Sequence, residues 1–215
     1  MNENQKIDEI LKSAIEYHKK NDFENAEKLY KKILNIDADH FGSIFLLGSL
    51  SAQIRNLTAA RSLLERAIKI NPKHAEAQYN LGNVLGQMGD SKQAIKLYEK
   101  AIEINPNYFE AYNNLGNLLR ESGETLQTIK LYEKAIKINP NYFEAYNNLG
   151  VIFAALKEVK KAIDSYKKAI EINPNYAVAH NNLGLIFHEI GMYKDAIASY
   201  KKQLKLIPII QTLME

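Results

Sequence analysis

Apolar and small side chains recur along the chain at two alternating helical spacings. In 109–142, residues spaced i, i+3, i+4 and i+7 form one face of a first helix: Tyr112, Leu115, Gly116 and Leu119. Each such helix is followed by a second one with its own small and apolar face. In the stretch 75–108 this second face consists of Ala94, Tyr98 and Ala101. The positions between them are rich in Lys, Glu and Asn, so each pattern predicts an amphipathic helix. The alternation predicts an all-α protein built from helix pairs.

The helix pairs repeat with a fixed period of 34 residues. All five prolines follow this step: Pro72, Pro106, Pro140, Pro174 and Pro208. A period of this length indicates a solenoid, in which each unit stacks on its neighbours. Six units follow one another without insertion: 7–40, 41–74, 75–108, 109–142, 143–176 and 177–210. We interpret 7–210 as a single repeat domain, with 1–6 as an N-terminal extension and 211–215 as a C-terminal tail.

Turn residues mark where each helix should end. Gly89, Gly123 and Gly191 follow the first helix of their units, and glycine is favoured there because it accepts a positive φ. The acidic residue that comes next, such as Asp90, suits the start of a helix. The Asn-Pro pair ends the second helix, since the residue before proline avoids the helical conformation.

Positions are counted here from the first residue of each 34-residue unit. Position 8, in the middle of the first helix, is glycine in five of the units. A glycine inside a helix costs about 0.5–1 kcal/mol relative to alanine, so its repetition indicates a packing requirement. Small residues at positions 20 and 27 likewise leave room for a neighbouring helix beside the second helix. We therefore expect the two backbones to approach closely, with the large tyrosine at position 24 filling the space beside the glycine.

This combination of residues resembles the tetratricopeptide repeat (TPR). In 109–142 the family pattern is carried by Tyr112, Leu115, Gly116, Tyr132, Ala135 and Pro140. The resemblance covers 7–210 and implies a right-handed α-solenoid of six helix-turn-helix units, whose first helices line a concave groove. The first unit departs from the pattern, with Ser13 and Ala14 in place of Leu-Gly, as an adapted N-terminal cap would. No closing helix follows Pro208, so we expect apolar side chains of the last helix to be exposed.

Composition narrows the function further. The chain lacks cysteine, which excludes disulfides, cysteine-ligated zinc and thiol catalysis. The net charge is +3 and lysines alternate with acidic residues, so no nucleic-acid stripe is expected. Neither a signal peptide nor a membrane span is predicted, and a cytoplasmic location follows as an expectation. His180 and His188 lie roughly 12 Å apart along one helix, too far to share a metal ion. With no hydrolase, metalloprotease or P-loop motif, we predict a non-enzyme without metal or cofactor.

Asparagine dominates the helix face opposite the packing face. The predicted groove residues are Asn80, Asn83, Asn113, Asn114, Asn117, Asn147, Asn148, Asn181 and Asn182. Asparagine is a poor helix residue, but its carboxamide both donates and accepts, so a row of them could bind the backbone of an extended peptide. This row resembles the asparagine ladder of the O-linked N-acetylglucosamine transferases at Asn80, Asn114, Asn148 and Asn182. The competing interpretation is that these amides bond only neighbouring helices or water.

A second binding mode of the family, the carboxylate clamp for chaperone tails, is disfavoured. That mode needs Lys or Arg beside the asparagines, whereas position 2 offers Glu76, Glu110 and Glu144. These carboxylates weakly favour neutral or basic ligand segments.

Three functional hypotheses remain open. The first is a non-catalytic scaffold that binds an extended protein segment, since such grooves suit unstructured ligands. The second is the TPR region of a larger glycosyltransferase or sulfotransferase, separated from its catalytic domain. The third is self-association through the uncapped C-terminal end.

Overall fold

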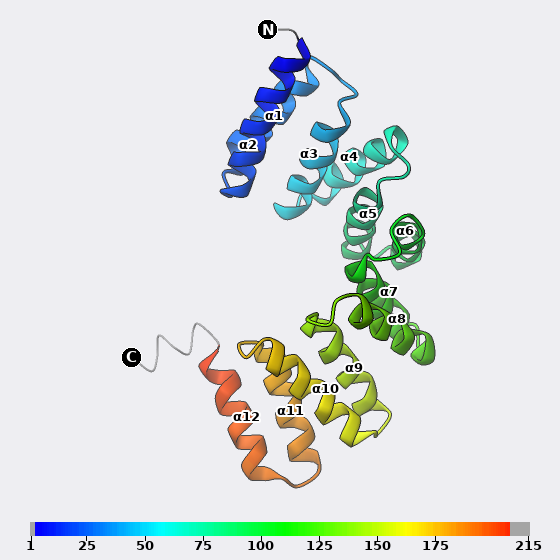
Figure 1. Ribbon diagram of the computed structural model, residues 1–215, viewed down its shortest axis with the longest axis vertical. Helices are drawn as coiled ribbons and strands as arrows, with labels where there is room; N and C mark the ends of the chain where they lie inside the picture. The colour runs from blue at the N-terminus through cyan, green and yellow to red at the C-terminus, as the bar shows by residue number, and fades with distance from the viewer. Residues whose placement is uncertain (1–2, 207–215) are drawn as a thin grey trace. The chain divides into compact units, whose positions relative to one another are not determined.

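The computed structural model describes residues 3–206, which form twelve α-helices and no strand (Figure 1). Their bounds are α1 (Glu3–Lys19), α2 (Phe23–Leu34), α3 (Phe41–Gln53), α4 (Leu57–Ile70), α5 (Ala75–Gln87), α6 (Ser91–Ile104), α7 (Phe109–Glu121), α8 (Thr125–Ile138), α9 (Phe143–Ala155), α10 (Val159–Ile172), α11 (Ala177–Glu189) and α12 (Tyr193–Lys205). Each 34-residue repeat forms one helix hairpin. The hairpins group into two larger compact units: the first unit is Met1–Pro106 with α1–α6, and the second unit is Asn107–Glu215 with α7–α12. The predicted all-α class is confirmed. Pro208 and the predicted tail at 211–215 lie outside the described residues.

Each unit is a stack of three helix hairpins. The strongest packing joins the two helices of one hairpin, as in α5 with α6 or α9 with α10. Successive hairpins meet through the second helix of one and the first helix of the next, as in α4 with α5 and α10 with α11. Figure 1 shows this order within each unit. The predicted pairing of consecutive helices is therefore confirmed.

In the last four hairpins the mid-helix glycine contacts the tyrosine of the opposite helix, whereas in α3–α4 the residue opposite Gly48 is Leu64. A Cβ atom added to Gly116 would lie 2.7 Å from Cε1 of Tyr132, and one added to Gly150 would lie 2.5 Å from Cε1 of Tyr166. Both tyrosine rings are buried, so they have no room to retreat. The close approach predicted from positions 8 and 24 is confirmed, because the ring occupies the place of the missing side chain.

The turns within the hairpins also follow the sequence. Gly89 has φ +85°, directly after the last turn of α5, and Asp90 then accepts the backbone N–H of Gln93 at 3.1 Å as the N-cap of α6. The second helix ends at an extended asparagine, as at Asn105 before Pro106. The same left-handed position is occupied by Arg55 (φ 60°) in the second hairpin, so a non-glycine residue is tolerated there.

Contacts between hairpins involve positions that the pattern did not single out. Ala77 and Val84 of α5 are completely buried although they lie outside the face predicted to pack within the hairpin. Their counterparts Ala145 and Ile152 in α9 are also buried. These residues sit at positions 3 and 10, so α5 and α9 each have a second buried face, and each packs against the second helix of the preceding hairpin, α4 and α8 respectively.

The packing requirement predicts opposite effects for two alanine substitutions in α5. Gly82→Ala would place a Cβ 2.8 Å from Tyr98 and should destabilise the protein by about 1–3 kcal/mol through overpacking. Gly86→Ala, one turn later, meets nothing closer than 3.9 Å and should be neutral or stabilise by about 0.5–1 kcal/mol. Urea denaturation followed by circular dichroism measures both. Equal effects of the two substitutions would contradict the close-packing account.

Candidate functional site

The first unit contains a cavity whose lining includes two of the predicted groove residues, Asn80 and Asn83. It has a volume of about 230 Å³ between α3 and α5 and is lined by Ser49, Ala52, Gln53, Asn80, Asn83 and Gln87. These residues occupy positions 6, 9, 12 and 13 of two successive hairpins. The first helices α3 and α5 thus present one mostly polar surface across two neighbouring hairpins.

Hydrogen bonds fix the asparagines of this cavity. Asn80 Nδ2 donates to Ser49 Oγ of the preceding hairpin at 3.0 Å. The hydroxyl of Tyr98 donates to Asn83 Oδ1 at 2.8 Å, within the same hairpin. One amide therefore links two hairpins, and the other is oriented by the tyrosine that packs against Gly82.

The second unit repeats this arrangement with more amides. Asn148 Nδ2 donates to Asn113 Oδ1 at 2.9 Å and to Asn117 Oδ1 at 3.2 Å. Asn182 Nδ2 donates to Asn147 Oδ1 at 3.0 Å. The position 5 residues Asn113 and Asn147 are each only 4% exposed, so their carboxamides serve contacts between helices.

The hydrogen bonds to Asn117 determine which amide atoms on the groove side can still bond to a ligand. Its Oδ1 accepts from Asn148 and also from the hydroxyl of Tyr132 at 2.8 Å, which occupies both lone pairs. Within residues 3–206, the amide donors of Asn117 and the carbonyl oxygen of Asn148 are then unused. Both side chains are partly exposed. One donor group and one acceptor therefore lie on adjacent hairpins, on side chains whose orientation is already fixed.

Asn181 and Asn182 extend the row into the last hairpin, and both are partly exposed. Asn114 is also partly exposed and accepts from Asn113 Nδ2 at 3.3 Å. Position 9 becomes apolar beyond Asn117, with Leu185 exposed in α11. The amide-rich surface therefore gains an apolar border in the last hairpin.

Glu144 is the electrostatic exception on this surface. Its side chain is partly buried, and Oε2 is buried with no hydrogen-bond partner within the described residues. Burial raises the pKa of the Glu144 carboxyl, because the charged form loses hydration. Burial, and secondarily the Glu144 charge, also raises the pKa of Tyr176. Burial alone raises the pKa of Tyr166 to about 12.

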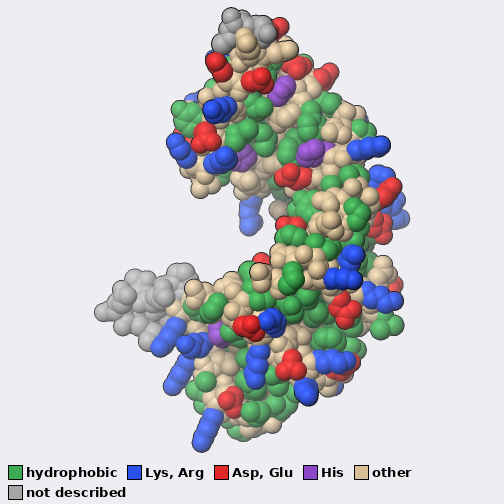
Figure 2. Space-filling view, in the orientation of Figure 1, with side chains coloured by type: hydrophobic (Ala, Val, Ile, Leu, Met, Phe, Trp, Pro, Cys, Tyr) green, Lys and Arg blue, Asp and Glu red, His purple; other side chains and the backbone are tan. Residues whose placement is uncertain are grey.

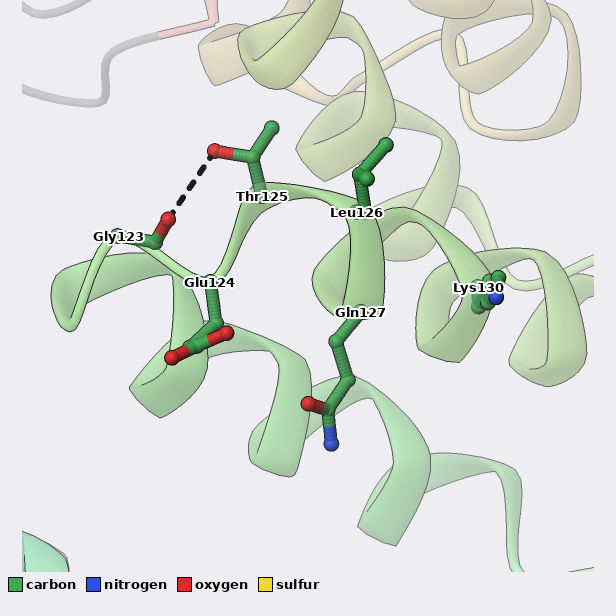
Figure 3. Close-up of a pocket in the computed structure, with 6 residues that line it drawn as sticks. All are labelled: Gly123, Glu124, Thr125, Leu126, Gln127 and Lys130. Carbon is green, nitrogen blue, oxygen red and sulfur yellow. Dashed lines mark hydrogen bonds between the residues drawn. The ribbon is translucent and has the colours of Figure 1, made fainter.

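Two other surface features carry less chemistry. A cavity of about 550 Å³ lies at the start of α8, lined by Gly123, Glu124, Thr125, Leu126, Gln127 and Lys130 (Figure 3). Its side chains diverge: Thr125 and Leu126 point to one side of the segment, and Glu124 and Gln127 to the other. Basic and acidic side chains lie interspersed on the face drawn in Figure 2, as on a solvated helix surface.

The outer face of α12 carries an exposed apolar stripe. Tyr193, Ile197 and Leu204 are 60%, 53% and 42% exposed. One period earlier, the corresponding residues of α10 are partly buried and pack against the cluster formed with α11: Val159, Ile163 and Ile170. The predicted exposure of apolar side chains on the last helix is seen for these residues. Self-association through this face stays a prediction.

No set of three or more His, Asp or Glu side chains within residues 3–206 is arranged to hold a metal ion. Among the helices of the same range, none combines the length and apolar character needed to cross a membrane.

Family models identify the repeat. Models described as "Tetratricopeptide repeat" match 75–108 and 143–176, then 97–130 and 165–198, and 11–40; a model described as "TPR repeat" matches 56–89 and 116–157. Together these matches extend over most of the chain. The chain belongs to the TPR family. The family resemblance predicted from the Gly, Tyr, Ala and Pro positions is confirmed.

Solved structures of other proteins are similar to this chain over most of their length. MamA matches with 27% identity and a TM-score of 0.65, covering 74% of this chain and 94% of MamA. YrrB, "a TPR protein with an unusual peptide-binding site", matches with 25% identity and a TM-score of 0.64, covering 79% of this chain and 88% of YrrB. PilF of Pseudomonas aeruginosa matches with 18% identity and a TM-score of 0.82, and the match covers 94% of this chain and 91% of PilF. At this identity the match shows a shared fold.

Comparison with curated proteins gives no match. The closer resemblance to the superhelix of the O-linked N-acetylglucosamine transferases gains no support from these findings.

The raised pKa of Glu144 predicts how its removal changes stability. The folded protein holds the proton more tightly than the unfolded chain, so the carboxyl lowers stability as pH rises from about 4.5 through the raised folded pKa. Glu144→Gln should therefore raise the urea midpoint near pH 7, and the gain should shrink as pH falls through this range. Glu76→Gln, at the same position on an exposed side chain, is the control and should change little. A lower midpoint for Glu144→Gln at pH 7 would show that the carboxylate is stabilising.

Proposed function

We propose that this TPR protein is a non-catalytic interaction scaffold that binds an extended peptide segment through the amides on its first helices. The observation that carries the proposal is the pair formed by Asn117 and Asn148. Their mutual bond, together with Tyr132, leaves amide donors on one residue and a carbonyl acceptor on the other. A peptide group offers the matching acceptor and donor, so it can be bound without reading a side chain.

The similarity to YrrB adds support of a different kind, because that protein is a TPR protein with a peptide-binding site. The polar cavity at Asn80 and Asn83 shows the same surface chemistry in the first unit. Both units thus present partly exposed amides at positions 6 and 9. A ligand that is extended and makes many modest contacts suits such a surface better than a compact one.

The alternative is that the chain is the TPR region of a larger glycosyltransferase or sulfotransferase. In that case the groove would deliver protein substrates to residues outside these 215 positions. The peptide-binding property would then be the same, so the test below applies to both hypotheses.

Asn117→Asp separates ligand binding from packing. The carboxylate still accepts from Tyr132 and Asn148, so the stack is kept, but the two amide donors are lost. The affinity for the strongest binder from a displayed random peptide library should fall by roughly tenfold, measured by fluorescence anisotropy. Asn141→Asp makes the same charge change on an exposed loop residue before α9 and should leave the affinity unchanged.

Two results would count against the proposal. One is a library that yields no binder to the unaltered protein, and the other is an unchanged affinity for Asn117→Asp with the melting temperature preserved. Asn148→Ala is a poorer probe, because it also leaves the buried Asn113 oxygen without its donor and should lower stability.

A further inference from the structure

We propose that the groove of the first unit contains a pocket for one apolar side chain of the ligand, next to its polar cavity. This inference rests on the proposed function and specifies the kind of peptide that is bound. The pocket lies among α1, α2 and α3 and has a volume of about 420 Å³. It is lined by Ile15, His18, Lys19, Asn21, Tyr30, Leu46 and Gln53.

The repeat register shows that this pocket replaces amides with hydrocarbon. Ile15 stands at position 9, where later hairpins have Asn83 and Asn117. Leu46 stands at position 6, the place of Asn80, Asn148 and Asn182 in later hairpins. Both apolar side chains are partly exposed in the pocket. At these two positions, where later hairpins present amides that can pair with a peptide group, Ile15 and Leu46 can only cover apolar ligand atoms.

His18 takes over the bond that the missing asparagine would make. Its Nδ1 lies 3.2 Å from the hydroxyl of Tyr30, and its Nε2 lies 3.1 Å from Gln53 Oε1. A neutral imidazole satisfies both, with the tyrosine donating to Nδ1 and Nε2–H donating to Gln53. These polar atoms bond to one another, and the ammonium group of Lys19 bonds to Glu16 at 3.4 Å, so Ile15 and Leu46 form the apolar part of the pocket.

Gln53 connects this pocket to the polar cavity. It lines the apolar pocket and also the cavity that contains Asn80 and Asn83. An extended peptide that enters the apolar pocket with one side chain therefore continues directly onto amides that can bind its backbone. The volume is in the range of small ligand sites and accommodates one large aliphatic or aromatic side chain. The occupant we infer is accordingly a peptide segment with a Leu, Ile, Met or Phe anchor.

The test selects a displayed random peptide library against the unaltered protein and against the double variant Ile15→Asn with Leu46→Asn. The variant installs the residues that later hairpins carry at these positions, so the fold should be retained, as circular dichroism and melting can check. Peptides selected by the unaltered protein should share one large apolar residue. Replacing that residue with Ala in the strongest binder should weaken binding at least tenfold. In the double variant the same replacement should change affinity less than twofold.

Val151→Asn is the matched control, because it makes the same kind of change at position 9 of α9 and should leave the anchor preference intact. The inference is overturned if the selected peptides share no apolar residue, or if the Ala replacement weakens binding equally in both proteins. Failure to select any peptide with the unaltered protein would overturn the proposed function itself.

Discussion

In two hairpins, α5–α6 and α7–α8, the tyrosine in the middle of the second helix connects the packing of the hairpin with its groove surface. The ring of Tyr132 lies where Gly116 has no side chain, which brings α7 and α8 together. Its hydroxyl then donates to Asn117 on the groove side of α7. Tyr98 does the same with Gly82 and Asn83 in the first unit. One side chain therefore sets the distance between two helices and the orientation of an amide available to a ligand.

The two interpretations of the asparagine row are complementary. Bonds from Asn148 and Asn182 to the preceding hairpins show that part of the hydrogen-bonding capacity stabilises the stack. A carboxamide has more donors and acceptors than these bonds use, and the remaining atoms are held in fixed directions. Preorganised groups lose less entropy when a ligand binds, so the structural role supports the proposed binding role.

Much of the fold could be predicted from the sequence, because the helix pattern and the turn residues act locally. Gly89, Asp90 and the Asn105–Pro106 pair occupy the predicted ends of their helices. Burial of Asn113 and Asn147 could not be predicted, since it depends on how successive hairpins tilt against each other. The same limit applies to the Ile15 and Leu46 pocket. Its signal was present in the departure of both residues from the asparagine register, but only the structure brings them together.

The most direct measurement of the link between packing and groove is the peptide affinity of Tyr132→Phe. This residue is completely buried and cannot touch a ligand, and phenylalanine keeps the ring against Gly116. Calorimetry with the strongest library peptide should show a roughly five- to tenfold weaker affinity, because Asn117 loses one of the two hydrogen bonds that orient it. An affinity within twofold of the unaltered protein would contradict the account.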